Sequence, residues 1–262
     1  MSNPAMAALA VLAMATAGVC LAALWLTRAQ RRPADPPRRL AWVGGLGLIA
    51  IWGFLVPINV WSHLSGDHDA WIFGAETFDG GIVENLTVLF YGLAIVVSGL
   101  VFIRASRLYG PASGGLWRGL LVVMIVCFAA MIGEEMSWGQ HLIGFQTPAE
   151  LAAVNLQGES NLHNLVSPRL YDLVYQGLGF ALILLPPVAW FAMRGPALPS
   201  PVLFLQDLYI NPWAYSLLAS AGVLLQHEVF EELAEMVLAF AILYALATLA
   251  VRAGRAPLSP TS

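Results

Sequence analysis

The sequence contains no lysine and few charges of any kind. All twelve basic residues are arginines, and the charged residues together make up 11% of the 262 residues. Hydrophobic residues make up 59%. A chain with so few charges and so much hydrocarbon is typical of a protein that lies within a lipid bilayer. The net charge of −4 and the lack of a lysine-rich patch give no reason to expect nucleic acid as a partner.

Cysteine is also scarce. The only two, Cys20 and Cys127, both lie within long apolar runs that we expect to be helical. Disulfides form in oxidising surroundings, and both cysteines lie inside predicted helices and not in a loop that such surroundings reach. We therefore expect neither a disulfide nor a thiolate metal site, and we interpret both cysteines as packing residues.

Long apolar runs dominate the rest of the sequence. A transmembrane helix needs about 20 apolar residues, and six runs approach or exceed this length: residues 4–26, 40–61, 82–103, 120–138, 171–193 and 233–251. A seventh run, residues 213–225, is short and crosses the bilayer only if residues 201–210 extend it or if the bundle lets water reach its end. The arginine cluster follows the first run instead of preceding it, so we expect this run to remain as an anchor.

Charged residues divide between the two sides of the predicted bundle. With seven spans, eleven of the twelve arginines lie on one side, and fourteen of the sixteen carboxylates and all five histidines lie on the other. Arginine in short loops stays cytoplasmic. We therefore predict an all-α, polytopic transmembrane bundle of about seven spans, with the N-terminus outside and the C-terminus cytoplasmic. It forms one domain, residues 1–262, with short tails at residues 1–3 and 254–262.

Three polar stretches lie on the acidic side, and each combines Glu with His. The first is Gly133-Glu134-Glu135-Met136-Ser137-Trp138-Gly139-Gln140-His141, at the outer end of the fourth span. If the helix continues through it, Glu134, Ser137 and His141 share one face, and Glu135 is turned about 100° away. The second stretch, residues 155–164, places Glu159 and His163 four residues apart, so they are neighbours if the segment is helical.

The third stretch, residues 226–235, opens the last span. His227, Glu231 and Glu235 form one stripe along its helix, and Glu84 adds an acid at the start of the third span. The helix dipole favours acids in a first turn by about 0.3–1 kcal/mol each. That accounts for Glu231 but not for Glu235, which lies further in. A structural interpretation stays open for all three stretches: acids that reach water at the headgroups, a hydrogen-bonded loop, and helix-start acids.

Ionisable groups at membrane depth are costly, so they indicate function by default. Carboxylate and imidazole are common ligands of metal sites in helix bundles. We predict that these side chains meet at the outer mouth of the bundle around a divalent transition metal, zinc or iron, with haem as the less favoured cofactor. The predicted catalytic residues are Glu134, Glu135 and His163; the predicted metal ligands are Glu134, Glu159, His163, His227 and Glu231; the further candidates are Glu84, Ser137, His141 and Glu235.

Two of these stretches resemble the signature of an uncharacterised family of bacterial multi-pass inner-membrane proteins. The signature is roughly Glu-Glu-x-Ser-Trp-Gly-Gln followed by Gln-Gly-Glu-x-Asn-Leu-His-Asn, and residues 133–140 and 155–164 are similar to it. The resemblance implies the bacterial inner (plasma) membrane but no activity. In the family pattern a basic residue often stands at the position of His141, which favours Glu134, Glu135, Glu159 and His163 as the core of the site.

The residues favour an integral membrane protein with a buried Glu/His site at its periplasmic mouth. We expect a metal-dependent hydrolase, or a related enzyme, acting on a lipid or isoprenoid-like substrate that arrives from the bilayer. The alternatives are a cation or proton transporter or channel, and a non-catalytic subunit that binds haem or docks a partner. No ionisable residue lies in the inner half of the third, fourth or last span, which favours a one-sided pocket over a conduit. The oligomeric state stays open.

The predicted topology has a direct test. Residues 110–115 and 195–200 should face the cytoplasm, whereas Asp67 and Glu159 should face outward, because arginine-rich loops stay inside. In single-cysteine variants, a membrane-impermeant thiol reagent applied to intact cells should label Asp67→Cys and leave Leu198→Cys unlabelled. Labelling of Leu198→Cys would overturn the count of seven spans.

Overall fold

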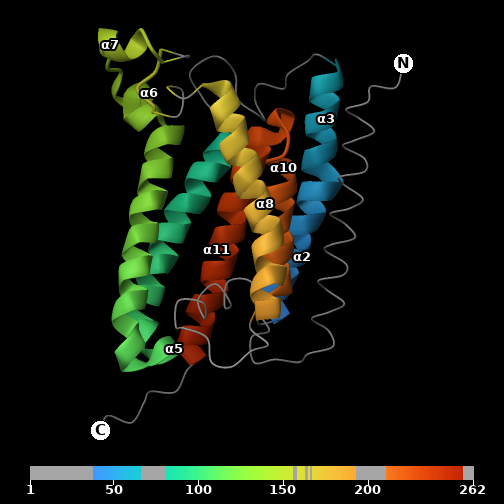
Figure 1. Cartoon of the computed structure of the whole chain (residues 1–262), viewed down its shortest axis with the longest axis vertical. Coiled ribbons are helices and arrows are strands. Elements are labelled where there is room, and N and C mark those ends of the chain that lie inside the picture. The colour runs from blue at the N-terminus through green and yellow to red at the C-terminus, as the bar shows by residue number, and fades with distance from the viewer. Residues whose placement is uncertain are drawn as a thin grey trace.

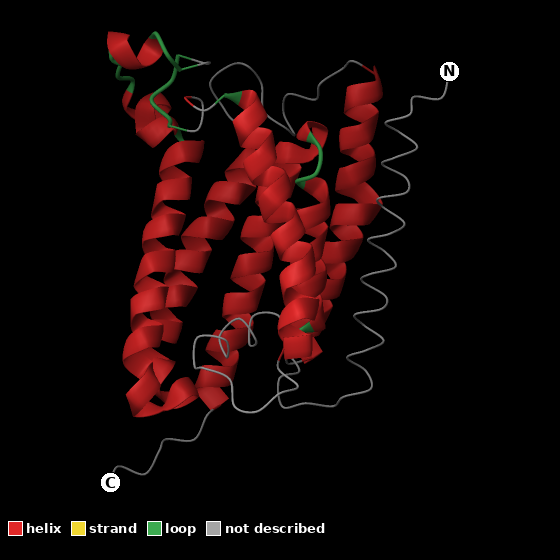
Figure 2. Cartoon of the chain, viewed as in Figure 1, coloured by secondary structure: helices red, strands yellow, loops and turns green. Residues whose placement is uncertain are grey.

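The computed structural model describes residues 38–65, 81–155, 158–162, 165, 167–192 and 211–255. Over these ranges the chain forms helices and connecting turns, with no strand, as Figure 2 shows. The all-α prediction is therefore confirmed for the described residues. The first predicted span, residues 4–26, lies outside them.

The helices pack side by side along a common direction (Figure 1). The first described span is continuous through α2, a short π-helix η1 and α3, and the later long helices are α5, α8, α10 and α11. Short helices connect them at one end. The bounds are α2 Arg38–Ala50, η1 Ile51–Leu55, α3 Val56–Ser65, α5 Ile82–Glu135, η2 Ser137–Gly139, α6 Gln140–Ile143, α7 Ala149–Ala152, α8 Pro168–Ala192, α10 Pro212–Leu224, η4 Glu228–Phe230 and α11 Glu231–Arg255.

Helix α5 contains two spans that fold back on each other. Residues Ile82–Ala105 and Gly114–Glu135 are each long and apolar enough to cross a membrane, and Figure 1 shows the reversal at the lower end of the bundle. Beside this reversal, the buried Trp117 packs in one cluster with Val101 and Ala105. The hairpin brings the start and the end of α5, both acidic, back to the same end of the bundle.

Among the described residues, four helices have the length and hydropathy of membrane spans: Arg39–Ser62, the two arms of α5, and Glu228–Arg255. They confirm a membrane-type helix bundle, and three of the predicted spans agree with them in position apart from their ends. The fourth predicted span, residues 120–138, ends early in the structure, because α5 stops at Glu135. The count of seven spans and the orientation of the termini stay predictions.

Helix α11 is the centre of the bundle. It packs against α5 in one apolar cluster and against α10 and the first described span (α2, η1 and α3) in another. Alanines on α11 such as Ala239, Ala241 and Ala245 are buried at these contacts. In lipid, helices associate through close van der Waals packing, and small residues permit the backbones to approach. Alanine therefore suits a helix with neighbours on several sides.

Glycines mark the closest helix contacts. A Cβ at Gly44 would lie 2.8 Å from the Cβ of Trp213, and one at Gly47 would lie 2.5 Å from the ring of Phe240. Helix α2 of the first described span thus packs closely against α10 at Gly44 and against α11 at Gly47. Helices α8 and α10 meet backbone to backbone, since a Cβ at Gly222 would lie 2.6 Å from the carbonyl oxygen of Gly179.

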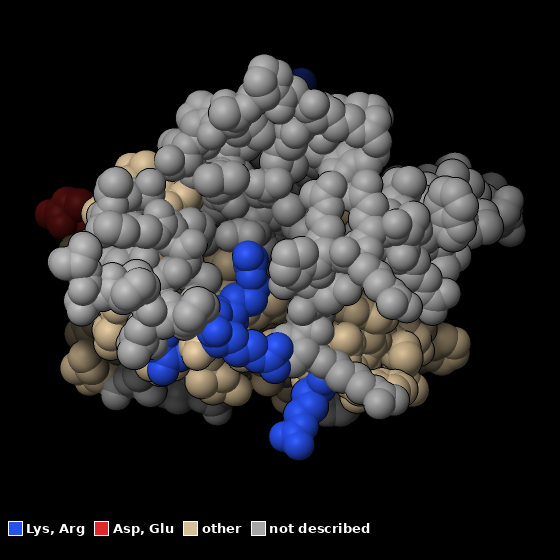
Figure 3. All heavy atoms as spheres, turned by 90° about the horizontal axis from the view of Figure 1, so that it is seen from below, with Lys and Arg blue, Asp and Glu red and all other residues tan. Residues whose placement is uncertain are grey.

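The charged side chains separate along the bundle axis. Every described Asp and Glu lies at the end that carries α6 and α7 in Figure 1, which we call the acidic end: Glu84, Glu134, Glu135, Glu150, Glu159, Asp172, Glu228, Glu231, Glu232 and Glu235. Apart from Arg169 near the start of α8, the arginines whose side chains are described lie at the opposite, basic end, seen in Figure 3: Arg39, Arg104, Arg118, Arg252 and Arg255. The sequence predicted this division.

The contact between Gly179 and Gly222 should be the most sensitive packing point of α8. We expect Gly222→Ala to destabilise the protein by about 1–3 kcal/mol, because its methyl group meets a backbone oxygen that cannot rotate away. Thermal unfolding in detergent measures this. Gly99→Ala is the matched control, since a Cβ there meets nothing within 4 Å. Equal melting temperatures of the two variants would contradict the proposed backbone contact.

Candidate functional site

Three carboxylates from two helices meet at the acidic end. Glu135 is the last residue of α5, and Glu232 and Glu235 lie in the first turns of α11. One carboxylate oxygen from each lies within 4.8 Å of those of the other two. We call these three residues the carboxylate cluster. Glu135 and Glu235 are half-buried, and Glu232 is exposed.

Like charges this close repel one another unless a cation or shared protons neutralise them. The surroundings add to the negative charge, because Glu84, Glu134 and Glu231 are near enough to interact electrostatically with members of the cluster. An arrangement of this kind is costly in an apolar bundle. It is therefore a candidate site for a cation.

Two tyrosines of α8 attach to the cluster. The hydroxyl of Tyr175 donates a hydrogen bond to Glu235, and the hydroxyl of Tyr171 donates to that of Tyr175 at 2.5 Å. The two rings lie 4.2 Å apart, one helical turn from each other. Through this chain α8 contributes to a site whose carboxylates come from α5 and α11.

Glu134 has a different environment from its neighbour Glu135. One of its carboxylate oxygens accepts from the indole N–H of Trp138 at 2.7 Å, and the other accepts from the backbone N–H of Leu162 at 2.7 Å. A Cβ at Gly133 would lie 2.9 Å from the Trp138 ring, so the indole lies directly over the glycine. Glu134 thus holds the turn after α5 and the following loop together.

A left-handed turn ends α5. Ser137, Trp138 and Gly139 have φ of 45°, 54° and 81°. Two consecutive residues other than glycine in this region are uncommon and cost free energy. The helix therefore does not continue, and the prediction that Glu134, Ser137 and His141 share one helical face is wrong. The side chain of His141 lies outside the described residues.

The two polar stretches on either side of this turn pack against each other. The hydroxyl of Ser137 donates to Glu159 at 2.6 Å, and the amide of Asn161 donates to the same oxygen at 2.9 Å. Asn155 in turn accepts from the backbone of Glu159 at 3.1 Å and donates to Asn161. Residues 158–162 are not helical, so the predicted helical pairing of Glu159 with His163 is wrong. His163 itself lies outside the described residues.

His227 begins the last helical segment as a cap and not as part of a helical stripe. Its backbone is extended, with φ of −147°, and its Nδ1 accepts the N–H of Val229 at 3.2 Å. The lone pair of Nδ1 is therefore directed at the backbone of its own turn. The predicted stripe keeps only Glu231 and Glu235, which both lie on α11.

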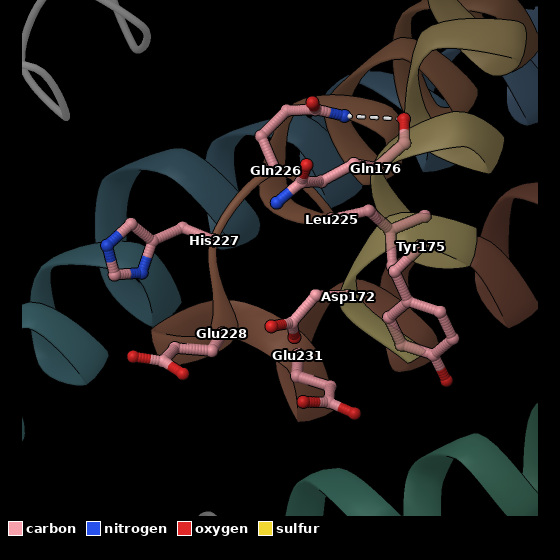
Figure 4. A pocket seen from close by; sticks show the side chains of 8 residues that line it. All are labelled: Asp172, Tyr175, Gln176, Leu225, Gln226, His227, Glu228 and Glu231. Atoms are coloured by element: carbon pink, nitrogen blue, oxygen red, sulfur yellow. Dashed lines mark hydrogen bonds between the residues drawn. The ribbon is translucent and has the colours of Figure 1, made fainter. Parts of the chain in front are cut away.

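A pocket of about 250 Å³ opens beside the cluster, between the starts of α8 and α11 (Figure 4). Its wall contains carboxylates, amides, one imidazole, one phenol and one aliphatic side chain: Asp172, Tyr175, Gln176, Leu225, Gln226, His227, Glu228 and Glu231. Gln226 donates to the backbone oxygen of Gln176 at 3.3 Å, which joins α8 to the turn before α11. Tyr175 belongs both to this wall and, through its hydroxyl, to the carboxylate cluster.

The structure groups the predicted residues differently from the single site that we expected. Glu135 and Glu235 meet in the carboxylate cluster, and His227 and Glu231 line the pocket. Glu134 accepts a hydrogen bond from Leu162. Glu159 accepts hydrogen bonds from Asn161 and Ser137, so both carboxylates hold the loop of residues 158–162 against the end of α5. Sequence reasoning missed Glu232, Tyr171 and Tyr175. The signals were present: Glu232 stands three residues before Glu235, and the tyrosines stand four apart at the same depth. The metal and catalytic roles stay predictions.

These features describe a helical protein compatible with an integral membrane location and carrying a polar site at one end of its bundle. No model of a protein family, no curated protein and no solved structure matches the chain. The resemblance of residues 133–140 and 155–164 to a bacterial membrane family therefore stays a prediction.

The bonds of Glu134 predict a structural role for this residue. In Glu134→Gln only one oxygen remains, so the amide nitrogen faces an N–H donor from either Trp138 or Leu162. We expect a loss of about 1–3 kcal/mol of stability and faster hydrogen exchange in residues 158–162. Glu150→Gln, an exposed change in α7, is the control. A melting temperature equal to that of the control would disprove the role.

Proposed function

We propose that this protein is an integral membrane enzyme that uses a divalent cation, bound by the carboxylate cluster, to hydrolyse a lipid substrate. The observation that carries the proposal is the convergence of Glu135, Glu232 and Glu235 within 4.8 Å. The cluster lies at the end of the bundle, where a substrate in the bilayer reaches it with its polar group. The hydrogen bond from Tyr175 orients Glu235 within the cluster.

The donor set favours a hard cation. The three residues offer oxygen ligands only, and carboxylate oxygens suit Mg²⁺, Mn²⁺ and Ca²⁺ better than ions that prefer nitrogen or sulfur. We expected zinc or iron because histidines stood near the acids in the sequence. His227 caps η4 instead, so within the described residues the cluster supports magnesium, manganese or calcium more than zinc or haem.

The proposed chemistry is simple hydrolysis. A bound divalent cation lowers the pKa of a coordinated water and polarises the oxygen of an ester. The hydroxyl of the water adds to the ester centre, and its proton passes through a carboxylate to the departing alcohol oxygen. Glu84 and Glu231, two of the further carboxylates near the cluster, are the candidates for this proton transfer.

A conduit for cations or protons is the second candidate, and the distribution of ionisable groups argues against it. Between the acidic and the basic ends, the four membrane-type helices contain no Asp, Glu, His, Arg or Lys. The buried side chains of α11 between Val237 and Ala253 are apolar apart from Tyr244 and Thr248. An enzyme with its site at one end of the bundle needs no path of polar groups through the bilayer, and we therefore favour the enzyme over the conduit.

The bacterial inner membrane is the proposed location. The support for it is the resemblance of residues 133–140 and 155–164 to a family of bacterial inner-membrane proteins. The separation of arginines from carboxylates supports the orientation, because arginine-rich ends stay cytoplasmic. On this assignment the carboxylate cluster faces the periplasm. The substrate then reaches the cluster from the outer leaflet of that membrane.

Cation binding tests the proposal. Purified protein freed of metal with a chelator should bind Mn²⁺ and gain thermal stability, by about 2.7 kcal/mol when free Mn²⁺ is 100 times its Kd. Glu135→Gln should weaken binding at least tenfold, and it should raise the stability of the metal-free protein, because it removes one of the repelling charges.

The control for cation binding is Glu150→Gln, which changes an exposed carboxylate in α7. It should bind Mn²⁺ as the unaltered protein does. Glu235→Gln should behave as Glu135→Gln does. Failure of the unaltered protein to bind Mn²⁺, Mg²⁺ or Ca²⁺ at millimolar concentration would end the proposal, as would unchanged binding by Glu135→Gln.

A further inference from the structure

A buried tyrosine of α5 lies next to the carboxylate cluster, on the side toward the middle of the bundle. Tyr91 is 3% exposed and packs in one apolar cluster with Phe128 and Ala239. Phe128 stands about two helical turns before Glu135 on α5. Ala239 stands about one turn after Glu235 on α11. The residues that surround Tyr91 therefore lie on the same helix faces as two members of the carboxylate cluster.

The side chain of Tyr91 points toward the carboxylate cluster. In an α-helix the Cα–Cβ bonds tilt toward the N-terminus, and α5 begins at the acidic end (Figure 1). Tyr91 stands about two turns after Glu84 on the same face of α5. The ring of Phe128, with its centroid 5.7 Å away and its plane 26° from parallel, holds the ring of Tyr91 in place. The phenol is near enough to interact electrostatically with Glu235 and Glu135.

The hydroxyl of Tyr91 has no hydrogen-bond partner among the residues that the structure describes. Tyr175, in contrast, donates to Glu235. A buried phenol normally finds a partner, and a buried hydroxyl left without one costs about 1–3 kcal/mol. A hydroxyl in this state beside three carboxylates therefore indicates a ligand, bound between them, that completes its hydrogen bonding.

A water molecule attached to a cation fits this position. The cluster offers three carboxylates, and Mg²⁺ bound by only a few carboxylates keeps several waters in its coordination shell. The phenol oxygen of Tyr91 accepts a hydrogen bond from such a water. Its O–H donates to the hydroxide that remains when the water loses a proton. One hydroxyl thus serves both forms of the water.

We propose that the hydroxyl of Tyr91 holds a water molecule of the cation in the carboxylate cluster, and that this water attacks the ester. The inference deepens the proposed function and rests on it for the presence of the cation. Because Tyr91 is buried, the attacking water lies on the bundle side of the cluster. The ester then approaches from the other side, where Glu232 is exposed.

Tyr91→Phe tests this role, because it removes the hydroxyl and keeps the ring that stacks on Phe128. The variant should bind Mn²⁺ about tenfold more weakly than the unaltered protein, since losing a group that orients a metal's ligand costs about 10–100-fold in affinity. Relaxation of the ¹⁷O resonance of water should show a several-fold shorter residence time of water on Mn²⁺. The melting temperature without metal should not fall, because no hydrogen bond to a described residue is lost.

Tyr244→Phe is the matched control. It removes the same atom from an equally buried ring, which is 2% exposed and lies more than two turns beyond Glu235 on α11. Its affinity for Mn²⁺ and its water residence time should equal those of the unaltered protein. Equal values in Tyr91→Phe would overturn the inference and leave the proposed cation site standing. An unaltered protein that binds no divalent cation would end the proposed function and the inference together.

A second measurement keeps the hydroxyl in place and so does not depend on the folding of Tyr91→Phe. With 3-fluorotyrosine at position 91, the ¹⁹F resonance should shift when Mg²⁺ binds, because the hydroxyl then gains a hydrogen bond. The same label at position 244 should not respond. An unchanged resonance at position 91 in protein saturated with Mg²⁺ would also overturn the inference.

Discussion

The packing of α11 between α5 and α10 is the constraint on which the rest of the structure depends. Its buried alanines let neighbouring helices approach, and its first turns carry Glu231, Glu232 and Glu235. In lipid, where water supplies no hydrophobic force between helices, such close contact holds the bundle together. The same contact that stabilises the bundle brings the acids of α11 against Glu135 of α5. Stability and a concentration of negative charge thus come from one helix.

Two neighbouring glutamates, Glu134 and Glu135, have separate tasks because α5 ends at Glu135 and a left-handed turn follows it. Glu134 binds the indole of Trp138 and the backbone of Leu162, whereas Glu135 meets α11. The left-handed backbone at Ser137 and Trp138 makes this division possible, because it turns the chain back over the helix end. Backbone strain of this sort persists where surrounding bonds hold it. The bonds of Ser137 to Glu159 and of Trp138 to Glu134 supply that support.

Tyr175 belongs to both polar features of the acidic end, the pocket and the carboxylate cluster. It is part of α8, whose approach to α10 is set by the backbone contact of Gly179 with Gly222. From this position its ring lines the pocket and its hydroxyl reaches Glu235. A shift of α8 would therefore change the pocket and the carboxylate cluster together. This coupling makes the packing of two glycines relevant to the site.

The sequence by itself determined the helical class, the positions of the described membrane-type spans apart from their ends, and the gathering of acids at one end. These follow from hydropathy and charge, which are properties of single residues and short windows. Only the tertiary structure decided that Glu135 and not Glu134 meets Glu235, that His227 caps a helix, and that tyrosines of α8 join the site. Those outcomes depend on where a helix ends and on which helices pack together although they are far apart in the sequence. A local pattern of residues does not specify such contacts.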